Sequence, residues 1–175
     1  MNTVQQVFKT TDNTILIVKA TTEGCNNRQY VSVTATEIKP ILRSDAVEQC
    51  KESLLDGELW RQAVQAEQTE LGLEEWAEYV IAIDGDLSMF DNSLYDSEIE
   101  INGQDYIFHS LSCGRLHDDI KGVTKEFNTL ISLHLSDNKD ALTQAEKIIF
   151  KLQKSANTDI DFYVEKYTRE ILELQ

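Results

Sequence analysis

The chain has 175 residues, of which 41% are hydrophobic, and its 31 acidic residues against 16 basic ones give a formal net charge of −15 at pH 7. This hydrophobic content excludes an intrinsically disordered chain, and the length fits a single domain, 1–175. The negative charge opposes direct binding to nucleic acids and to anionic membranes, because both would repel the protein, so we expect basic proteins as partners.

The sequence predicts a cytoplasmic protein. Its first ten residues, MNTVQQVFKT, contain neither the basic leader nor the apolar stretch of a secretory signal. No apolar run approaches the roughly 20 residues that cross a bilayer. The three cysteines, Cys25, Cys50 and Cys113, are odd in number and widely spaced, which fits a reducing compartment better than a disulfide framework.

The first 43 residues predict an antiparallel β-meander. Three runs rich in β-branched and apolar residues are its expected strands: 4–10, 14–20 and 29–38. The polar residues 11–13 predict a tight turn, and Gly24 with two asparagines predicts a loop over 21–27. Pro40 is expected to end this part of the chain.

The segment 44–105 is expected to be mainly helical. Its predicted helices cover 44–55, 58–68 and 73–83. Ser44 is the expected N-cap of the first helix, and Asp45 follows in the first turn, where a carboxylate suits the helix dipole. Apolar residues of the third helix recur at the spacing of one buried face: Leu73, Trp76, Val80 and Ile83. The residues 87–95 show no regular pattern.

A β-hairpin is the strongest local prediction. Two alternating runs, 98–101 and 104–111, flank Asn102 and Gly103. Both residues tolerate the positive φ that a two-residue type I′ turn requires, so this dipeptide is typical of a hairpin.

The segment 106–175 is expected to be mainly helical beyond this hairpin. Three apolar stripes at helical spacing begin at Leu116, Leu142 and Ile160, and Asn157 or Thr158 is the expected cap of the last helix. The stripes predict either core or the interface of a homodimer. The predicted fold class is therefore α+β: an N-terminal antiparallel β-meander, a helical acidic middle with an additional β-hairpin, and a C-terminal group of about three helices.

The negative charge is concentrated in the middle of the chain. The segment 44–105 has 17 acidic residues against only Lys51 and Arg61, a net of −15. The segments 1–43 and 106–175 carry +2 and −2. Each like-charged pair at i,i+4 on a helix costs roughly 0.2–0.5 kcal/mol, and nothing within this segment offsets that cost.

This concentration predicts a protein-binding surface. On a helix, Glu67, Glu70, Glu74 and Glu78 would form one row of carboxylates, with neighbours roughly 5–6 Å apart. The predicted partner-binding residues are Glu67, Glu70, Glu74, Glu75, Glu78, Asp84, Asp86, Asp91, Asp96, Glu98 and Glu100. The alternative is an acidic face that serves only solubility.

The function that we expect is that of a non-enzymatic, DNA-mimic-like inhibitor without a cofactor. Its acidic surface would block a basic site on a nuclease or another nucleic-acid-processing protein, gaining speed from electrostatic steering. Two settings fit the same physics. One is an antagonist of restriction or CRISPR defence, and the other is an immunity protein against a toxic nuclease.

A second hypothesis is a small metal-dependent enzyme or regulator. His109, Cys113 and His117 are spaced four apart, and both residue types are good zinc ligands. Gly114 would interrupt a helix across this set, and His109 falls in a predicted strand, where a core or edge histidine with satisfied hydrogen bonds is the simpler interpretation. No residue is therefore predicted as a metal ligand. A third hypothesis is a purely structural or oligomerisation protein held together by the C-terminal stripes.

Overall fold

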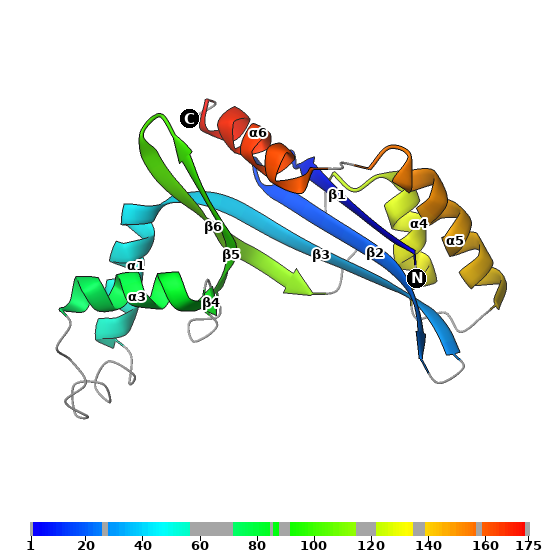
Figure 1. Cartoon of the computed structure of the whole chain (residues 1–175), viewed down its shortest axis with the longest axis horizontal. Coiled ribbons are helices and arrows are strands. Elements are labelled where there is room, and N and C mark those ends of the chain that lie inside the picture. Colours follow the sequence, from blue (N-terminus) through cyan, green and yellow to red (C-terminus); the bar gives the residue numbers. More distant parts are fainter. Residues whose placement is uncertain are drawn as a thin grey trace. The chain divides into compact units, whose positions relative to one another are not determined.

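The computed structural model describes residues 2–25, 28–56, 72–84, 86–87, 92–114, 122–134, 139–156 and 159–173. The chain has an α+β fold, as predicted from the sequence (Figure 1). It divides into two compact units, which we name the terminal unit (Met1–Ile38 with Ser112–Gln175) and the acidic unit (Lys39–Leu111). Each unit has a hydrophobic core of its own. The single domain expected from the length stays a prediction.

The terminal unit contains the predicted antiparallel meander. Its strands are β1 (Thr3–Lys9), β2 (Ile15–Cys25) and β3 (Arg28–Leu42), whose last four residues belong to the acidic unit. The register places Val7 opposite Ile17 and Val18 opposite Ala35. Asn13, with φ of 58°, lies in the turn between β1 and β2.

Two boundaries in this meander differ from the prediction. β2 continues through 21–25, where a loop was expected, because these residues pair with β3, as Thr21 does with Ser32. β3 likewise continues through Pro40. The β2–β3 register ends at Ile38, so Pro40, which has no N–H, removes no hydrogen bond from that ladder.

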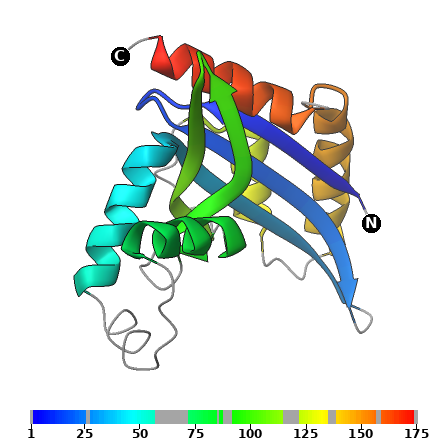
Figure 2. The ribbon, with the colours of Figure 1, turned by 60° about the vertical axis from the view of Figure 1, so that its left-hand side comes forward.

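Both faces of this sheet are covered by helices (Figures 1 and 2). These are α4 (Lys125–Leu133), α5 (Lys139–Gln153) and α6 (Ile160–Leu172). Leu16 and Val18 pack in one core with α4 and α5. Lys9, opposite Ile15 in the register, forms an ion pair with Glu170 of α6, which places α6 over the other face. Burial on both faces explains the continuous apolar run of β2.

The helices of the terminal unit bury most of the predicted apolar positions that the structure describes, and the others are partly buried. The fully or nearly fully buried ones are Phe127, Leu130, Leu142, Ala145, Ile149, Leu152, Val164 and Ile171. α6 has Asp159 as its N-cap, whose Oδ1 accepts from the Phe162 N–H at 3.0 Å, so the expectation of Asn157 or Thr158 as the cap is wrong. α4 begins after the cap Thr124, and the stripe expected from Leu116 is described from Val123 onward, where it packs against the core of this unit.

In the residues that the structure describes, the acidic unit combines two helices with a β-hairpin. Its elements are α1 (Arg43–Asp56), α3 (Leu73–Asp84), β4 (Asp86–Leu87), β5 (Asn92–Ile101) and β6 (Gln104–Gly114), whose last three residues belong to the terminal unit. The predicted hairpin is confirmed: Asn102 and Gly103 have φ of 55° and 74°, and Ile101 pairs with Gln104. The helix predicted over 58–68 lies outside the described residues.

Three details of the acidic unit correct the prediction. The stretch 87–95 is not irregular where it is described, since Asp86 pairs with Ser93. α1 begins at Arg43, one residue before the expected cap Ser44, because β3 passes into the helix without a loop. β6 continues to Gly114, three residues beyond the strand predicted over 104–111.

The core of the acidic unit lies between α1, α3 and β6. It consists of Ala46, Val47, Cys50, Leu54, Ala77, Ile81 and Ile107. On α3 the most buried described positions are Ala77 and Ile81, whereas the predicted Leu73 and Trp76 are only partly buried. The buried face of α3 is therefore rotated relative to the prediction, because α1 packs against the side that carries Ala77.

Candidate functional site

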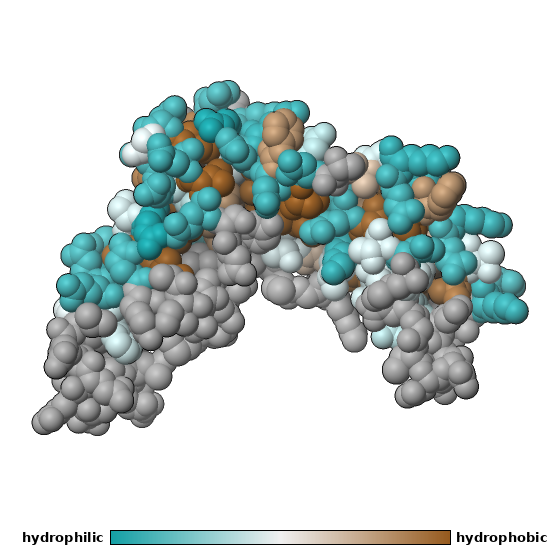
Figure 3. Space-filling view, in the orientation of Figure 1, coloured by the Kyte–Doolittle hydropathy of each residue, from teal (hydrophilic) through white to brown (hydrophobic). Residues whose placement is uncertain are grey.

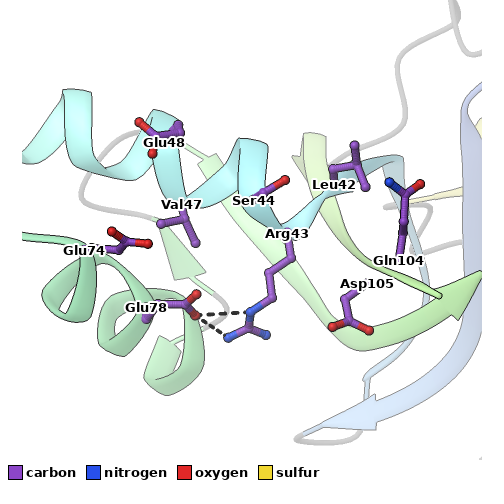
Figure 4. A pocket seen from close by; sticks show the side chains of 9 residues that line it. All are labelled: Leu42, Arg43, Ser44, Val47, Glu48, Glu74, Glu78, Gln104 and Asp105. Atoms are coloured by element: carbon purple, nitrogen blue, oxygen red, sulfur yellow. Dashed lines mark hydrogen bonds and ion pairs between the residues drawn. The ribbon is translucent and has the colours of Figure 1, made fainter.

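A cleft of about 380 Å³ opens in the acidic unit between the start of α1, α3 and the β5–β6 hairpin (Figure 4). Four of its lining residues are carboxylates and one is an arginine. The lining residues are Leu42, Arg43, Ser44, Val47, Glu48, Glu74, Glu78, Gln104 and Asp105. The structure therefore gathers acidic side chains from three elements around a single guanidinium.

Arg43 lies at the centre of this arrangement. Its Nε and Nη2 donate to Oε2 of Glu78 at 3.2 and 2.6 Å, as the dashed lines in Figure 4 show, and its Nη1 donates to Oε1 of Glu98. The hydrogen bond with Glu78, together with the nearby charge of Glu98, raises the pKa of Arg43 above its ordinary value. Arg43 thus stays cationic and joins α1, α3 and β5.

Lys51 is engaged in the same way within α1. Its Nζ lies 2.7 Å from Oε1 of Glu48, one turn earlier. This hydrogen bond raises the pKa of Lys51, and the charge of Glu74 adds to the effect. Both described basic side chains close to the cleft are therefore bound by carboxylates of the unit itself.

Other carboxylates around the cleft form no ion pair with a residue that the structure describes. Asp105 is exposed, and its side chain makes no hydrogen bond or ion pair with any residue that the structure describes. The register places it directly opposite Glu100 on β5, and like charges in such positions destabilise a sheet. On α3, Glu74 is exposed as well, while Oε2 of Glu75 accepts from the Gly72 N–H at 3.0 Å and so caps the helix.

A further row of exposed acidic residues lies on α1. Asp45, Glu48 and Glu52 are exposed and spaced three and four apart, so they share one helix face. In the space-filling view the described surface over α1 and α3 is predominantly hydrophilic (Figure 3). Sequence reasoning missed this row, although the same three–four spacing identifies it.

The predicted partner-binding residues meet different outcomes. Glu67, Glu70 and Asp91 lie outside the described residues, and only the backbone is described at Asp84, Asp86 and Asp96. Glu74 and Glu78 both line the cleft. Glu98 binds the guanidinium of Arg43, as Glu78 does. The expectation that no local cation offsets the repulsion is wrong at Glu78 and Glu98, because Arg43 immediately precedes the segment that was counted.

The structure does not support a helical zinc site at His109, Cys113 and His117. His109 and Cys113 both lie on β6, where residues four apart are separated by roughly 13 Å, and His117 lies outside the described residues. Across the described ranges, no group of three or more His, Cys, Asp or Glu residues could hold a metal ion.

His109 also differs from the satisfied histidine expected from the sequence. Its Nε2 is buried and has no hydrogen-bond partner in the described part of the chain. Burial lowers the pKa of His109 below 6.5, so the imidazole is mainly neutral at pH 7.

Comparison with protein-family models, with curated proteins and with solved structures finds no match for this chain. Among the helices that the structure describes, none is sufficiently long and apolar to span a membrane.

Proposed function

We propose that this protein is a non-enzymatic inhibitor whose acidic unit occupies a basic site on a nucleic-acid-processing protein, as a DNA-mimic-like ligand. The observation that carries the proposal is the charge of this unit. It has 17 acidic residues against 4 basic ones, a net of −13, whereas the terminal unit has 14 against 12, a net of −2. Arg43 and Lys51 are already bound by carboxylates, so the remaining negative charge is available to a partner.

The spacing of the exposed carboxylates supports the same proposal. On α1, Asp45, Glu48 and Glu52 recur three and four positions apart, which places neighbours roughly 5–6 Å from one another. Duplex DNA also presents closely spaced negative charges, about one per 1.7 Å of axis. A groove that binds phosphates with lysine and arginine would attract such rows and bind them faster through electrostatic steering.

Two cytoplasmic settings fit this surface. In one, the protein antagonises a restriction or CRISPR effector, and in the other it neutralises a toxic nuclease as an immunity protein. Both place the acidic unit in a basic groove and require neither catalytic residues nor a cofactor.

Three exposed carboxylates, one from each element around the cleft, provide the test. The variant Glu52→Gln, Glu74→Gln, Asp105→Asn removes three negative charges without touching the Arg43 ion pairs. The control variant Glu146→Gln, Asp161→Asn, Glu173→Gln makes the same charge change at exposed positions of the terminal unit. Glu78 is left unchanged, because a substitution there would break an ion pair and confuse unfolding with lost binding.

Each protein is immobilised and used to capture partners from a lysate of the cells that produce it. We expect the wild type and the control variant to retain the same basic nucleic-acid-binding protein, and added duplex DNA to displace it. The cleft variant should bind this partner about tenfold more weakly, since each lost charge pair contributes up to about 1 kcal/mol. Equal affinities of the cleft and control variants for the captured partner would contradict the proposal.

A further inference from the structure

Arg43 connects three elements of the acidic unit through one side chain. Its backbone begins α1, its guanidinium donates twice to Glu78 on α3, and it donates once to Glu98 on β5. Only a planar group with several N–H donors can hold two carboxylates from different elements in fixed directions. The single ammonium of a lysine lacks this geometry.

The elements that Arg43 connects repel one another. α3 carries Glu74, Glu75 and Glu78, and the hairpin carries further exposed carboxylates at Glu98 and Glu100. The apolar core beneath them stabilises the packing of α3 on α1, but burial of apolar area is non-directional and does not set the distance between carboxylates. The side chain of Arg43 is 25% exposed, and its guanidinium attracts the carboxylates of α3 and of the hairpin through Glu78 and Glu98.

We infer that Arg43 is a positioning residue, which through Glu78 and Glu98 fixes the separation between the carboxylates of α3 and those of the β5–β6 hairpin. Partner binding then depends on the pattern of these charges and not on their sum. The part of the inference that concerns partner binding rests on the proposed function, whereas the part that concerns the conformation of the acidic unit can be tested on the protein alone.

The effect of Arg43 on the conformation of the acidic unit is tested by amide hydrogen exchange of the full chain at about 0.01 M and about 1 M NaCl. Between these concentrations the Debye length falls from about 30 to about 3 Å. Arg43→Gln should raise exchange in α3 and β5 about tenfold at low salt, because an ion pair is lost and repulsion remains. At high salt the difference from wild type should largely disappear. A difference that salt leaves unchanged would show a packing role and overturn the inference.

Two further variants test whether the effect on exchange is specific to Arg43 and to its guanidinium. Lys51→Gln removes the other engaged cation, which bonds to Glu48 within α1 and attracts Glu74 of α3 but forms no hydrogen bond or ion pair with the described residues of β5, so exchange in β5 should stay close to wild type. Arg43→Lys keeps the charge without the planar donors and should restore less than half of the lost protection, so full restoration would contradict positioning.

If Arg43→Gln does not fold, Glu98→Gln removes one of the two ion pairs of Arg43 and should raise exchange in β5. Unchanged exchange in Glu98→Gln would overturn the inference.

The binding experiment distinguishes the arrangement of the carboxylates from the net charge of the protein, because Arg43→Gln makes the protein more acidic. If binding followed net charge, this variant would bind the captured partner as tightly as wild type or more tightly. Positioning predicts about tenfold weaker binding by Arg43→Gln and none of this loss for Lys51→Gln. Equal affinity of the two variants would overturn the inference. A wild type that captures no partner would refute the proposed function and leave the exchange result standing.

Discussion

At the scale of one residue, the position of Asp105 lowers the stability of the acidic unit. It is exposed on β6 and lies directly opposite Glu100, so two carboxylates face each other across the β5–β6 pairing. Such a like-charged pair is unfavourable for folding. Its presence therefore supports a requirement other than stability at this position.

Asp105→Asn is expected to stabilise the acidic unit by about 0.2–1 kcal/mol, because it removes this repulsion. Urea unfolding followed by tryptophan fluorescence measures the change, since both tryptophans, Trp60 and Trp76, belong to the acidic unit. Glu100→Gln should give a similar gain, and the double variant should gain less than the sum, because both substitutions remove the same pair. Additive gains, or a loss of stability in either single variant, would contradict this account.

At the scale of elements, α6 is held on the sheet by apolar burial and by one ion pair. Val164 and Ile171 are almost fully buried, and Lys9 on β1 lies 2.8 Å from Oε2 of Glu170. The hydrogen bond from Lys9 lowers the pKa of Glu170 below its ordinary value of 4.5. A carboxylate with a lowered pKa in the folded state contributes stability above its unfolded pKa, and this contribution is lost as the pH falls through the folded value.

Lys9→Met should return the titration midpoint of Glu170 to the ordinary glutamate range and flatten the loss of terminal-unit stability below about pH 4.5. NMR titration of the side-chain carboxyl carbons measures the midpoint. Glu126 serves as an internal control, because its pKa is lowered by Lys151 and should stay low in this variant. A Glu170 midpoint that does not move would show that Lys9 is not the cause.

At the scale of the whole molecule, the two units carry very different charge. The acidic unit has a net charge of −13 and the terminal unit of −2. Self-repulsion destabilises a compact state, and salt screens it. The two units should therefore respond differently to ionic strength although they belong to one chain.

Raising NaCl from about 0.01 M to about 1 M should slow amide exchange in α1 and α3 more than in β2 and α5, because screening acts mainly where like charges are crowded. Hydrogen-exchange mass spectrometry of the intact protein compares the units in one sample. The same slowing in both units would contradict a local electrostatic origin.

The elements predicted best are those whose signal is local. Asn102 and Gly103 determine their own turn, since the positive φ that they adopt is a property of these two residues. Apolar spacing similarly predicted the buried positions of α5. Boundaries failed where a partner strand decided them, as at Thr21, which pairs with Ser32 of β3 and so continues β2 where a loop was expected.

The sequence by itself determined the α+β class, the hairpin and the concentration of negative charge, because these follow from local propensity and from counting. Only the tertiary structure decided how that charge is organised. Arg43 meets Glu78 and Glu98 across 35 and 55 positions of sequence, and folding alone brings such residues together. The acidic surface is therefore arranged around a cation whose partners no local pattern reveals.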